Sequence, residues 1–445
     1  MDSGRLCYAG HVPTFLPFAG LRYDLDVLAA REPDSRPVHR TAALSQVIAP
    51  PYDVISPTER DELVGHSPYN VVQLELPVAD ANAGLDAYQA AARLLEAWKD
   101  EGILRRDGGP AFYAYAMSFE DEMGQPRRTA GVIGALALSP PGEGDILPHE
   151  HTMPKPKSDR LDLLRACHAN LSPVWGLSLA PGLSELCHPS AAAEIVTAVD
   201  DDAVTHQLWP SDPQAARTIS DLVSSAPVVI ADGHHRYETA LAYQAERRTE
   251  NNGQPGDHDY IMALVVELAN DQLSVRPIHR LVSGLPEDLD IVAELDRHFE
   301  MTPAPHGIPG SSPGEADGSA LLTSMADQGA LGLVTRQGIW LAQPRAATQA
   351  AGGADLDSAR LGVALADLAP HHLDYQHDVS EALGSVRSGR AQAAVLLRPA
   401  SVAVIAQTAN QRLRMPPKTT LFWPKPRTGM VIRPVDVGLA NRPGR

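Results

Sequence analysis

The chain has 445 residues, with 55 acidic against 37 basic side chains and a formal charge of −18. This length predicts two or three domains. The negative net charge argues against non-specific binding to the phosphate backbone of a nucleic acid. The three cysteines lack metal-knuckle spacing, and the sequence has neither a charged leader nor a run of 18 apolar residues. We therefore expect a cytoplasmic globular protein that binds neither nucleic acid nor membrane.

The first region, residues 1–145, alternates short apolar runs with helical patterns. Residues 71–76 alternate like a strand, and residues 83–104 place apolar side chains at helical spacing. Two more strands are expected over 111–119 and 130–138. These patterns predict an α+β region.

The central region, 146–290, begins with a loop rich in histidine, lysine and proline, and a helix is expected over 159–168. Residues 227–232 then resemble a β-branched strand, Gly233 a tight turn and the following residues a helix, and another strand is expected over 260–268. The third region, 291–445, has linker-like stretches at 303–319 and 350–355 and a strand-like stretch at 330–341. Residues 393–399 and 402–407 suggest another strand and its surroundings. We expect a second α+β region there, ending in a basic loop.

The stretch ADGHHRYETA, residues 231–240, gathers ionisable side chains around one glycine. A strand that enters a helix through a glycine turn leaves backbone N–H groups at the helix start, where they can bind an anion. Arg236 would oppose the helix dipole at that place, and a bound phosphate would reconcile its position. Phosphate binding by Asp232, Gly233, His234, His235 and Arg236 is favoured over a metal chelated by Asp232 and His234 and over a structural helix start capped by Asp232.

This motif resembles the nucleotide-binding motif of the ParB/sulfiredoxin superfamily, and especially its free-serine kinase branch, which carries Asp-Gly-His-His-Arg. The resemblance implies that residues 233–236 hold the phosphates of ATP or ADP, in preference to CTP, together with Mg²⁺, and that His235 takes part in catalysis. The loop LPHEHT, 147–152, is similar to an earlier motif of the superfamily, which implies that Glu150 is the base that activates a substrate hydroxyl. Partial burial would raise the pKa of Glu150 for this role. The alternative is a solvated connection stiffened by prolines.

The basic stretch 414–429 is unusual in an acidic protein. Its residues Lys418, Thr419, Thr420 and Lys425, with His149 upstream, are expected to orient the carboxylate of a substrate or to close the site. The alternative is a neutralising surface patch. In IAPPYDVIS, 48–56, a stiff turn could position the polar pair Tyr52 and Asp53, although a type I turn alone would explain the segment. In RPIHR, 276–280, His279 and Arg280 could line a pocket or could be satisfied structurally. With the motifs above, these segments resemble the domain-of-unknown-function family ten-fifteen over nearly the whole chain.

We therefore expect an α/β (α+β) protein with a ParB/sulfiredoxin-like nucleotide-binding core and additional α+β regions at both ends. By resemblance, it is a kinase that phosphorylates a small hydroxylated metabolite, with free serine as the leading substrate. Two other functions stay open. One is a nucleotide-responsive binding or regulatory protein without transfer, and the other is a metal-dependent hydrolase that uses the histidines. No feature of the sequence sets an oligomeric state.

Overall fold

The computed structural model describes residues 12–31, 40–121, 124–150, 158–191, 193–304, 318–353 and 355–435. Contacts divide the chain into two units. Unit 1 comprises Met1–Pro148, Pro154–Leu273 and Pro424–Arg445, and unit 2 comprises His149–Met153 and Ser274–Trp423. The expected regions 1–145, 146–290 and 291–445 do not coincide with these units, because the chain returns to unit 1 after residue 423.

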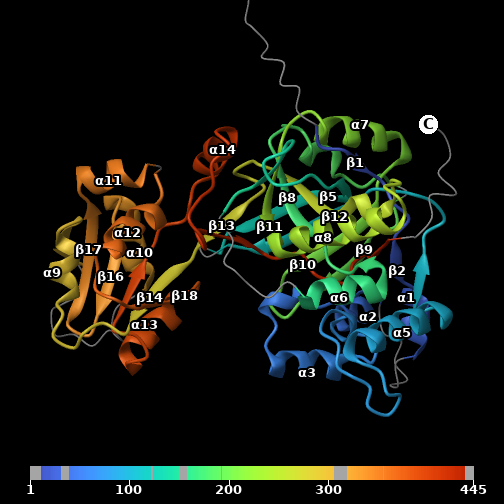
Figure 1. Ribbon diagram of the computed structural model, residues 1–445, viewed down its shortest axis with the longest axis horizontal. Coiled ribbons are helices and arrows are strands. Elements are labelled where there is room, and N and C mark those ends of the chain that lie inside the picture. Colours follow the sequence, from blue (N-terminus) through green and yellow to red (C-terminus); the bar gives the residue numbers. More distant parts are fainter. Residues whose placement is uncertain are drawn as a thin grey trace, which may run out of the picture. The chain divides into compact units, whose positions relative to one another are not determined.

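Unit 1 is built on a nine-stranded mixed sheet (Figure 1). The strand order is β6-β11-β8-β12-β5-β4-β10-β9, with β1 also paired to β5. β11 is parallel to β6, and β12 is parallel to β8. Strands β4 and β12 are buried on both faces, which explains why their sequences are apolar almost throughout. The strand bounds are Phe15–Leu16 for β1, Tyr113–Glu120 for β4, Pro126–Ala137 for β5, Ile146–Pro148 for β6, Val174–Ser178 for β8, Val196–Val199 for β9, Thr205–Pro210 for β10, Val228–Asp232 for β11 and Tyr260–Glu267 for β12.

Helices cover this sheet and form the N-terminal part of unit 1. The helix α8, His234–Glu250, packs on β8 and β12, and α6, Ser158–Cys167, lies beside α8 (Figure 1). The others are α1 Leu25–Arg31, α2 Arg40–Val47, α3 Pro57–His66, α4 Val72–Glu75, α5 Ala87–Asp100 and α7 Pro213–Val223, with 3₁₀ turns η1 Tyr52–Val54, η2 Ser184–Leu186 and η3 Asp257–Asp259. Two small antiparallel pairs complete the unit: β2 Leu21–Tyr23 with β3 Leu104–Arg106, and β7 Ala169–Asn170 with β21 Arg433–Pro434.

Unit 2 contains a six-stranded sheet of order β15-β17-β16-β19-β14-β18 with an apolar core on each face. Successive residues of β16 and β19 point into opposite cores, as the two-residue period of a strand requires. Its strands are β14 His279–Ser283, β15 Phe299–Pro303, β16 Leu331–Thr335, β17 Gly338–Pro344, β18 His372–Gln376 and β19 Ala393–Leu396. The helices are α9 Ile291–Asp296, α10 Gly318–Gln328, α11 Ala346–Gly352, α12 Asp357–Ala366, α13 Val379–Ser388 and α14 Val402–Asn410, and β13 Ser274–Pro277 pairs with β20 Thr420–Trp423.

The predicted mixed α/β class is confirmed, as are the strands at 111–119, 130–138 and 260–268 and the helix at 159–168. The strand predicted over 71–76 is wrong. Asn70 accepts a hydrogen bond from the Val72 N–H at 2.9 Å, and α4 follows, with Val72 and Leu74 both buried. Six alternating residues therefore fit a short buried helix as well as a strand.

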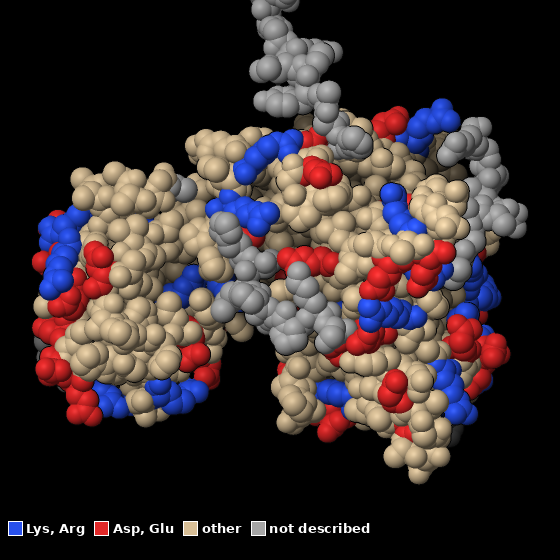
Figure 2. Space-filling model, in the orientation of Figure 1, with Lys and Arg blue, Asp and Glu red and all other residues tan. Residues whose placement is uncertain are grey.

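Two segments of unit 2 also differ from expectation. Residues 330–341 form the hairpin of β16 and β17 instead of one strand, and 402–407 lie in α14, whose start is capped by Ser401. Of the linker-like stretch 303–319, residues 305–317 lie outside the described part of the chain. Within the described residues, no helix is long and apolar enough to cross a membrane. Figure 2 shows both signs of charge on this face of each unit.

Candidate functional site

The predicted strand, glycine turn and helix are confirmed. β11 ends at Asp232, Gly233 has φ 90° and ψ 25°, and α8 begins at His234. A Cβ atom on Gly233 would lie 3.1 Å from Arg236 Nε and 3.1 Å from Val174 Cγ1. The turn therefore requires glycine for its left-handed backbone and for the close packing around it. The pairing of β11 with β8 also shifts between Ile230 and Asp232, a bulge that re-aims the Asp232 side chain.

Arg236 and Asp232 form an ion pair across this turn. Arg236 Nη2 lies 2.8 Å from Asp232 Oδ2, and Nη1 donates to the Pro173 carbonyl at 2.5 Å. Among the described residues, Arg236 Nε has no hydrogen-bond partner, although the side chain is only 10% exposed. Gly233 occupies the N-cap position and no side chain caps the described start of α8, so the alternative in which Asp232 is the cap is wrong.

Lys425 brings a second cation to Asp232. Its Nζ lies 2.8 Å from Asp232 Oδ1 and 3.7 Å from Asp53 Oδ2. Burial raises the pKa of Asp232, but Lys425 and Arg236 lower it more, to about 2. Burial lowers the pKa of Lys425, but Asp232 and Asp53 raise it above its ordinary value. Asp232 and Lys425 are therefore both charged at neutral pH.

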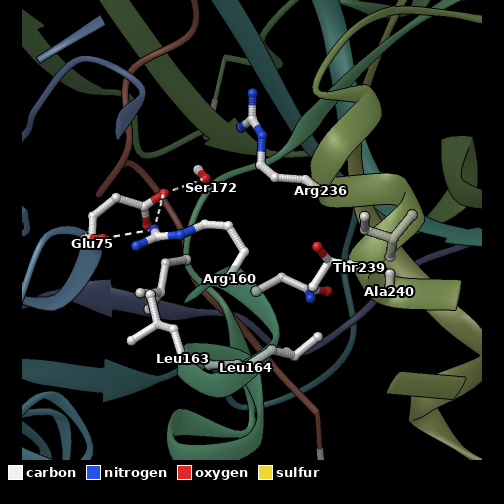
Figure 3. Close-up of a pocket in the computed structure, with 12 residues that line it drawn as sticks. Glu75, Arg160, Leu163, Leu164, Ser172, Arg236, Thr239 and Ala240 are labelled. Carbon is white, nitrogen blue, oxygen red and sulfur yellow. Dashed lines mark hydrogen bonds and ion pairs between the residues drawn. The ribbon is translucent and has the colours of Figure 1, made fainter. Parts of the chain in front are cut away.

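A cavity with a mainly apolar lining and a few polar groups lies beside Arg236 (Figure 3). The Arg160 guanidinium carbon lies 4.4 Å from the centroid of the Tyr52 ring. The guanidinium also donates to the Glu75 carbonyl at 2.7 Å. Ser172 Oγ donates to Glu75 Oε1 at 2.9 Å. The polar residues Glu75, Arg160, Ser172 and Arg236 line a cavity of about 60 Å³. This volume exceeds the space that one water molecule needs. The further lining residues are Leu163, Leu164, Ala169, Asn170, Leu171, Thr239, Ala240 and Ile261.

Unit 2 holds the other predicted residues around Glu150. The backbone N–H groups of Lys418, Thr419 and Thr420 donate to the Glu150 carboxylate at 3.0, 3.1 and 2.8 Å, and Thr420 Oγ1 donates at 2.8 Å. Lys418 has φ 58°, which helps successive N–H groups to converge. His149 Nε2 lies 2.8 Å from Thr420 Oγ1 and 3.2 Å from Glu150 Oε1. In this state the loop of residues 416–420 binds a carboxylate of its own chain.

The expectation that partial burial raises the pKa of Glu150 is wrong. Burial does raise it, but hydrogen bonds from His149 and Thr420 outweigh that effect and lower the pKa to about 2. The loop that provides these donors is itself held, because Arg280 donates to the carbonyls of Pro417 and Lys418 at 3.3 and 3.0 Å. His279 is buried, and its Nδ1 accepts the Leu397 N–H at 3.1 Å.

The histidines of the motif occupy the first two positions of α8. His235 Nδ1 lies 4.0 Å from Glu238 Oε2, and the His235 side chain is one-third exposed. Within the described residues, no three His, Cys, Asp or Glu side chains gather closely enough to hold a metal ion. The catalytic role predicted for His235 stays a prediction.

A comparison with family models identifies relatives of the chain. The model described as "Protein of unknown function (DUF1015)" matches residues 16–362, more than half of the sequence. The chain belongs to the DUF1015 family. A search of curated proteins gave no match.

Three solved structures illustrate what this DUF1015 protein is similar to. Free serine kinase in complex with AMP is 12% identical, with 62% of this chain and 83% of that chain covered and a TM-score of 0.32. A truncated SbnI from Staphylococcus aureus is 10% identical, with 70% and 90% covered and a TM-score of 0.38. A conserved hypothetical protein from Pyrococcus furiosus is 12% identical, with 62% and 87% covered and a TM-score of 0.32.

The structure of the DUF1015 protein thus sorts the predicted residues into two groups. Residues 232–236 and Lys425 belong to unit 1, whereas His149, Glu150 and residues 418–420 belong to unit 2. The sequence indicated Tyr52 and Asp53 only as a polar pair that a stiff turn could position. Glu75 and Ser172 were missed, and the available signal for Glu75 was an acid between two leucines, Leu74 and Leu76.

We expect the stability of this DUF1015 protein to fall between about pH 4.5 and pH 2. Asp232 and Glu150 have pKa values of about 2, below their ordinary values of 3.8 and 4.5. A depressed pKa contributes stability that is full above the unfolded value and is lost as the pH falls through the folded value. Urea unfolding at a series of pH values measures this loss. Glu150→Gln should flatten the curve in this window, and an unchanged curve would contradict the assignment.

Proposed function

We propose that this protein binds the phosphates of a nucleotide at the start of α8 and transfers a phosphoryl group to a small hydroxylated metabolite. The observation that carries the proposal is the convergence of Arg236 and Lys425 on Asp232, each at 2.8 Å, beside a glycine turn and a helix N-terminus. Two cations and the backbone N–H groups of a first helical turn are the arrangement that recognises phosphate oxygens.

Phosphate would bind by competing with Asp232 for these cations. Arg236 supports this because its Nε has no partner among the described residues, while its other nitrogens hold Asp232 and Pro173. A phosphate oxygen is a suitable acceptor for such a buried donor. Because Gly233 has no side chain, the Arg236 guanidinium can lie against the turn, with Nε 3.1 Å from the place of a Cβ atom.

A magnesium ion would be held here by two carboxylates together with the nucleotide phosphates. The carboxylates of Asp53 and Asp232 lie 3.7 and 2.8 Å from the Lys425 ammonium, and they would be left for a cation once a phosphate had taken Lys425. Magnesium prefers carboxylate and phosphate oxygens, and it would neutralise charge on the nucleotide. Asp53 and Asp232 are the residues that would hold it, with ATP or ADP in preference to CTP as the nucleotide.

The role of Glu150 as the base for the acceptor hydroxyl stays a prediction. A carboxylate with a pKa of about 2 is a weak base, so Glu150 would first have to leave the N–H groups of residues 418–420. Those donors would then be available for the carboxylate of a substrate, which agrees with the substrate-binding role predicted for Lys418, Thr419 and Thr420. Free serine, which has both a hydroxyl and a carboxylate, is the leading acceptor.

Ligand-induced thermal stabilisation tests nucleotide binding. ATP, ADP and CTP with Mg²⁺ are compared, and a ligand at about 100 times its Kd should add about 2.7 kcal/mol to the native state. Arg236→Ala should abolish the shift, whereas Arg165→Ala, which removes an exposed ion pair between α6 and α8, should keep it. For each variant, the rise in melting temperature on adding ligand is compared. The melting temperature without ligand is not used, because Arg236→Ala also removes the hydrogen bond to the Pro173 carbonyl and so lowers the stability of the free protein. An equal shift in Arg236→Ala, or none in the wild type, would refute the phosphate site.

A second candidate function is a nucleotide-responsive binding protein without phosphoryl transfer. It is favoured by the hydrogen bonds that hold the Glu150 carboxylate and keep its pKa low. Formation of ADP from ATP in the presence of serine and other hydroxylated metabolites distinguishes the two functions. A binding protein would show a raised melting temperature with nucleotide but would form no ADP.

A further inference from the structure

A closed ring of hydrogen bonds in unit 1 holds the segment that carries Lys425. The Arg427 N–H donates to Tyr115 Oη at 3.1 Å, and the Arg427 guanidinium pairs with Asp200, with Nε at 2.7 Å from Oδ2. His206 closes the ring, because its Nδ1 lies 2.7 Å from Tyr115 Oη and its Nε2 lies 2.8 Å from Asp200 Oδ2. None of these four side chains is more than 10% exposed.

The proton positions in this ring follow from its donors. The Asp200 carboxylate can only accept, so His206 Nε2 carries the proton of the neutral ring, and Tyr115 Oη, which accepts the Arg427 N–H, donates its own proton to Nδ1. The ring nitrogen Nδ1 therefore carries no proton, and Nε2–H donates to the Asp200 carboxylate. Tyr115 Oη both accepts and donates, so removing this hydroxyl would leave two buried groups, the Arg427 N–H and His206 Nδ1, unsatisfied.

Strand pairing places these residues together. Tyr115 on β4 lies opposite Leu208 on β10, and His206 lies opposite Met117, so Tyr115 and His206 are diagonal neighbours on one face. Asp200 lies in the turn between β9 and β10, where its other oxygen accepts two backbone N–H groups. The ring is therefore anchored on the sheet.

A short, stiff link connects this anchor to the candidate phosphate site. Lys425 lies two residues before Arg427, and both Pro424 and Pro426 have a restricted φ. On the other side of Arg427, Thr428 exchanges backbone hydrogen bonds with Ala49 at 2.8 and 3.1 Å. Because two residues span at most about 7 Å, anchoring Arg427 restricts where Lys425 can lie.

We propose that Tyr115, His206 and Asp200 are positioning residues that hold Lys425 at Asp232, and thereby at the phosphates of the nucleotide. This inference rests on the proposed function for its ligand. Its geometric part, the placement of residues 424–428, does not depend on the ligand.

Tyr115→Phe tests the proposal, with Tyr113→Phe as a matched control. Tyr113 lies on the same strand, is equally buried and uses its hydroxyl to bind Asp107 at 2.6 Å and the Gly20 N–H at 2.8 Å. We expect Tyr115→Phe to weaken ATP binding about tenfold in calorimetry, and Tyr113→Phe to change it less than about twofold. Equal affinities in Tyr115→Phe and the wild type would overturn the proposal.

A double-mutant cycle separates positioning from general destabilisation. If Tyr115 acts through Lys425, Tyr115→Phe should have almost no further effect on ATP affinity in the Lys425→Met background. An equal loss in both backgrounds would overturn the proposal. If the wild type binds no nucleotide, the proposed function fails, and hydrogen exchange decides the inference alone. The amides of Lys425, Arg427 and Thr428 should exchange faster in Tyr115→Phe than in Tyr113→Phe, and equal exchange would refute the inference.

Discussion

Replacing Lys425 by methionine is expected to weaken ATP binding about 30-fold, because a charge-assisted contact to phosphate contributes about 2 kcal/mol. Methionine keeps most of the length of the buried aliphatic stem and removes the ammonium group. The same change leaves Asp232 with Arg236 as its remaining cation in the cluster, so the pKa of Asp232 should rise from about 2. Isothermal calorimetry measures the affinity.

The matched control for this prediction is Lys99→Met. Lys99 is an exposed lysine of α5 that pairs with Glu96 on the same helix. Its replacement therefore removes one positive charge without touching the Asp232, Arg236 and Lys425 cluster. ATP affinity should be unchanged in Lys99→Met. If Lys425→Met bound ATP as tightly as the wild type, Lys425 would be a structural partner of Asp232 and would not contact phosphate.

The second large effect is expected from Glu150→Gln. If Glu150 accepts the proton of the acceptor hydroxyl, turnover should fall about 10²- to 10⁴-fold while ATP affinity stays the same. Glutamine keeps the size of the side chain but cannot accept all the hydrogen bonds that residues 418–420 donate to the carboxylate. Steady-state kinetics and calorimetry on the same protein preparations measure both quantities.

Thr420→Val distinguishes a base from a structural carboxylate at position 150. It removes the hydroxyl that donates to Glu150 at 2.8 Å and preserves the shape of the side chain. The pKa of Glu150 should then rise, and the acid limb of the pH–rate profile should move upward with it if Glu150 is the base. Unchanged turnover in Glu150→Gln would instead assign the carboxylate to holding residues 418–420 in place.

Local patterns were enough to predict the part of the site that lies within one short segment. Three local signals agree here: a β-branched run before Asp232 favours a strand, the single Gly233 favours a turn, and the apolar spacing after it favours a helix. The strand, the turn and the helix were therefore all correct. The stretch 71–76 failed because a short enclosed helix and a half-buried strand can present the same six apolar and polar positions.

The sequence by itself determined the strand–turn–helix, the charged residues that it presents and, through its motifs, the DUF1015 family. Only the tertiary structure decided the partners of those charges. Lys425 meets Asp232 across 193 residues, and Glu150 meets Thr420 across 270. Such contacts depend on which strands pair and where the chain returns, and both are set by the burial of apolar surface over a whole unit. A short sequence pattern does not show which distant segments this burial brings together.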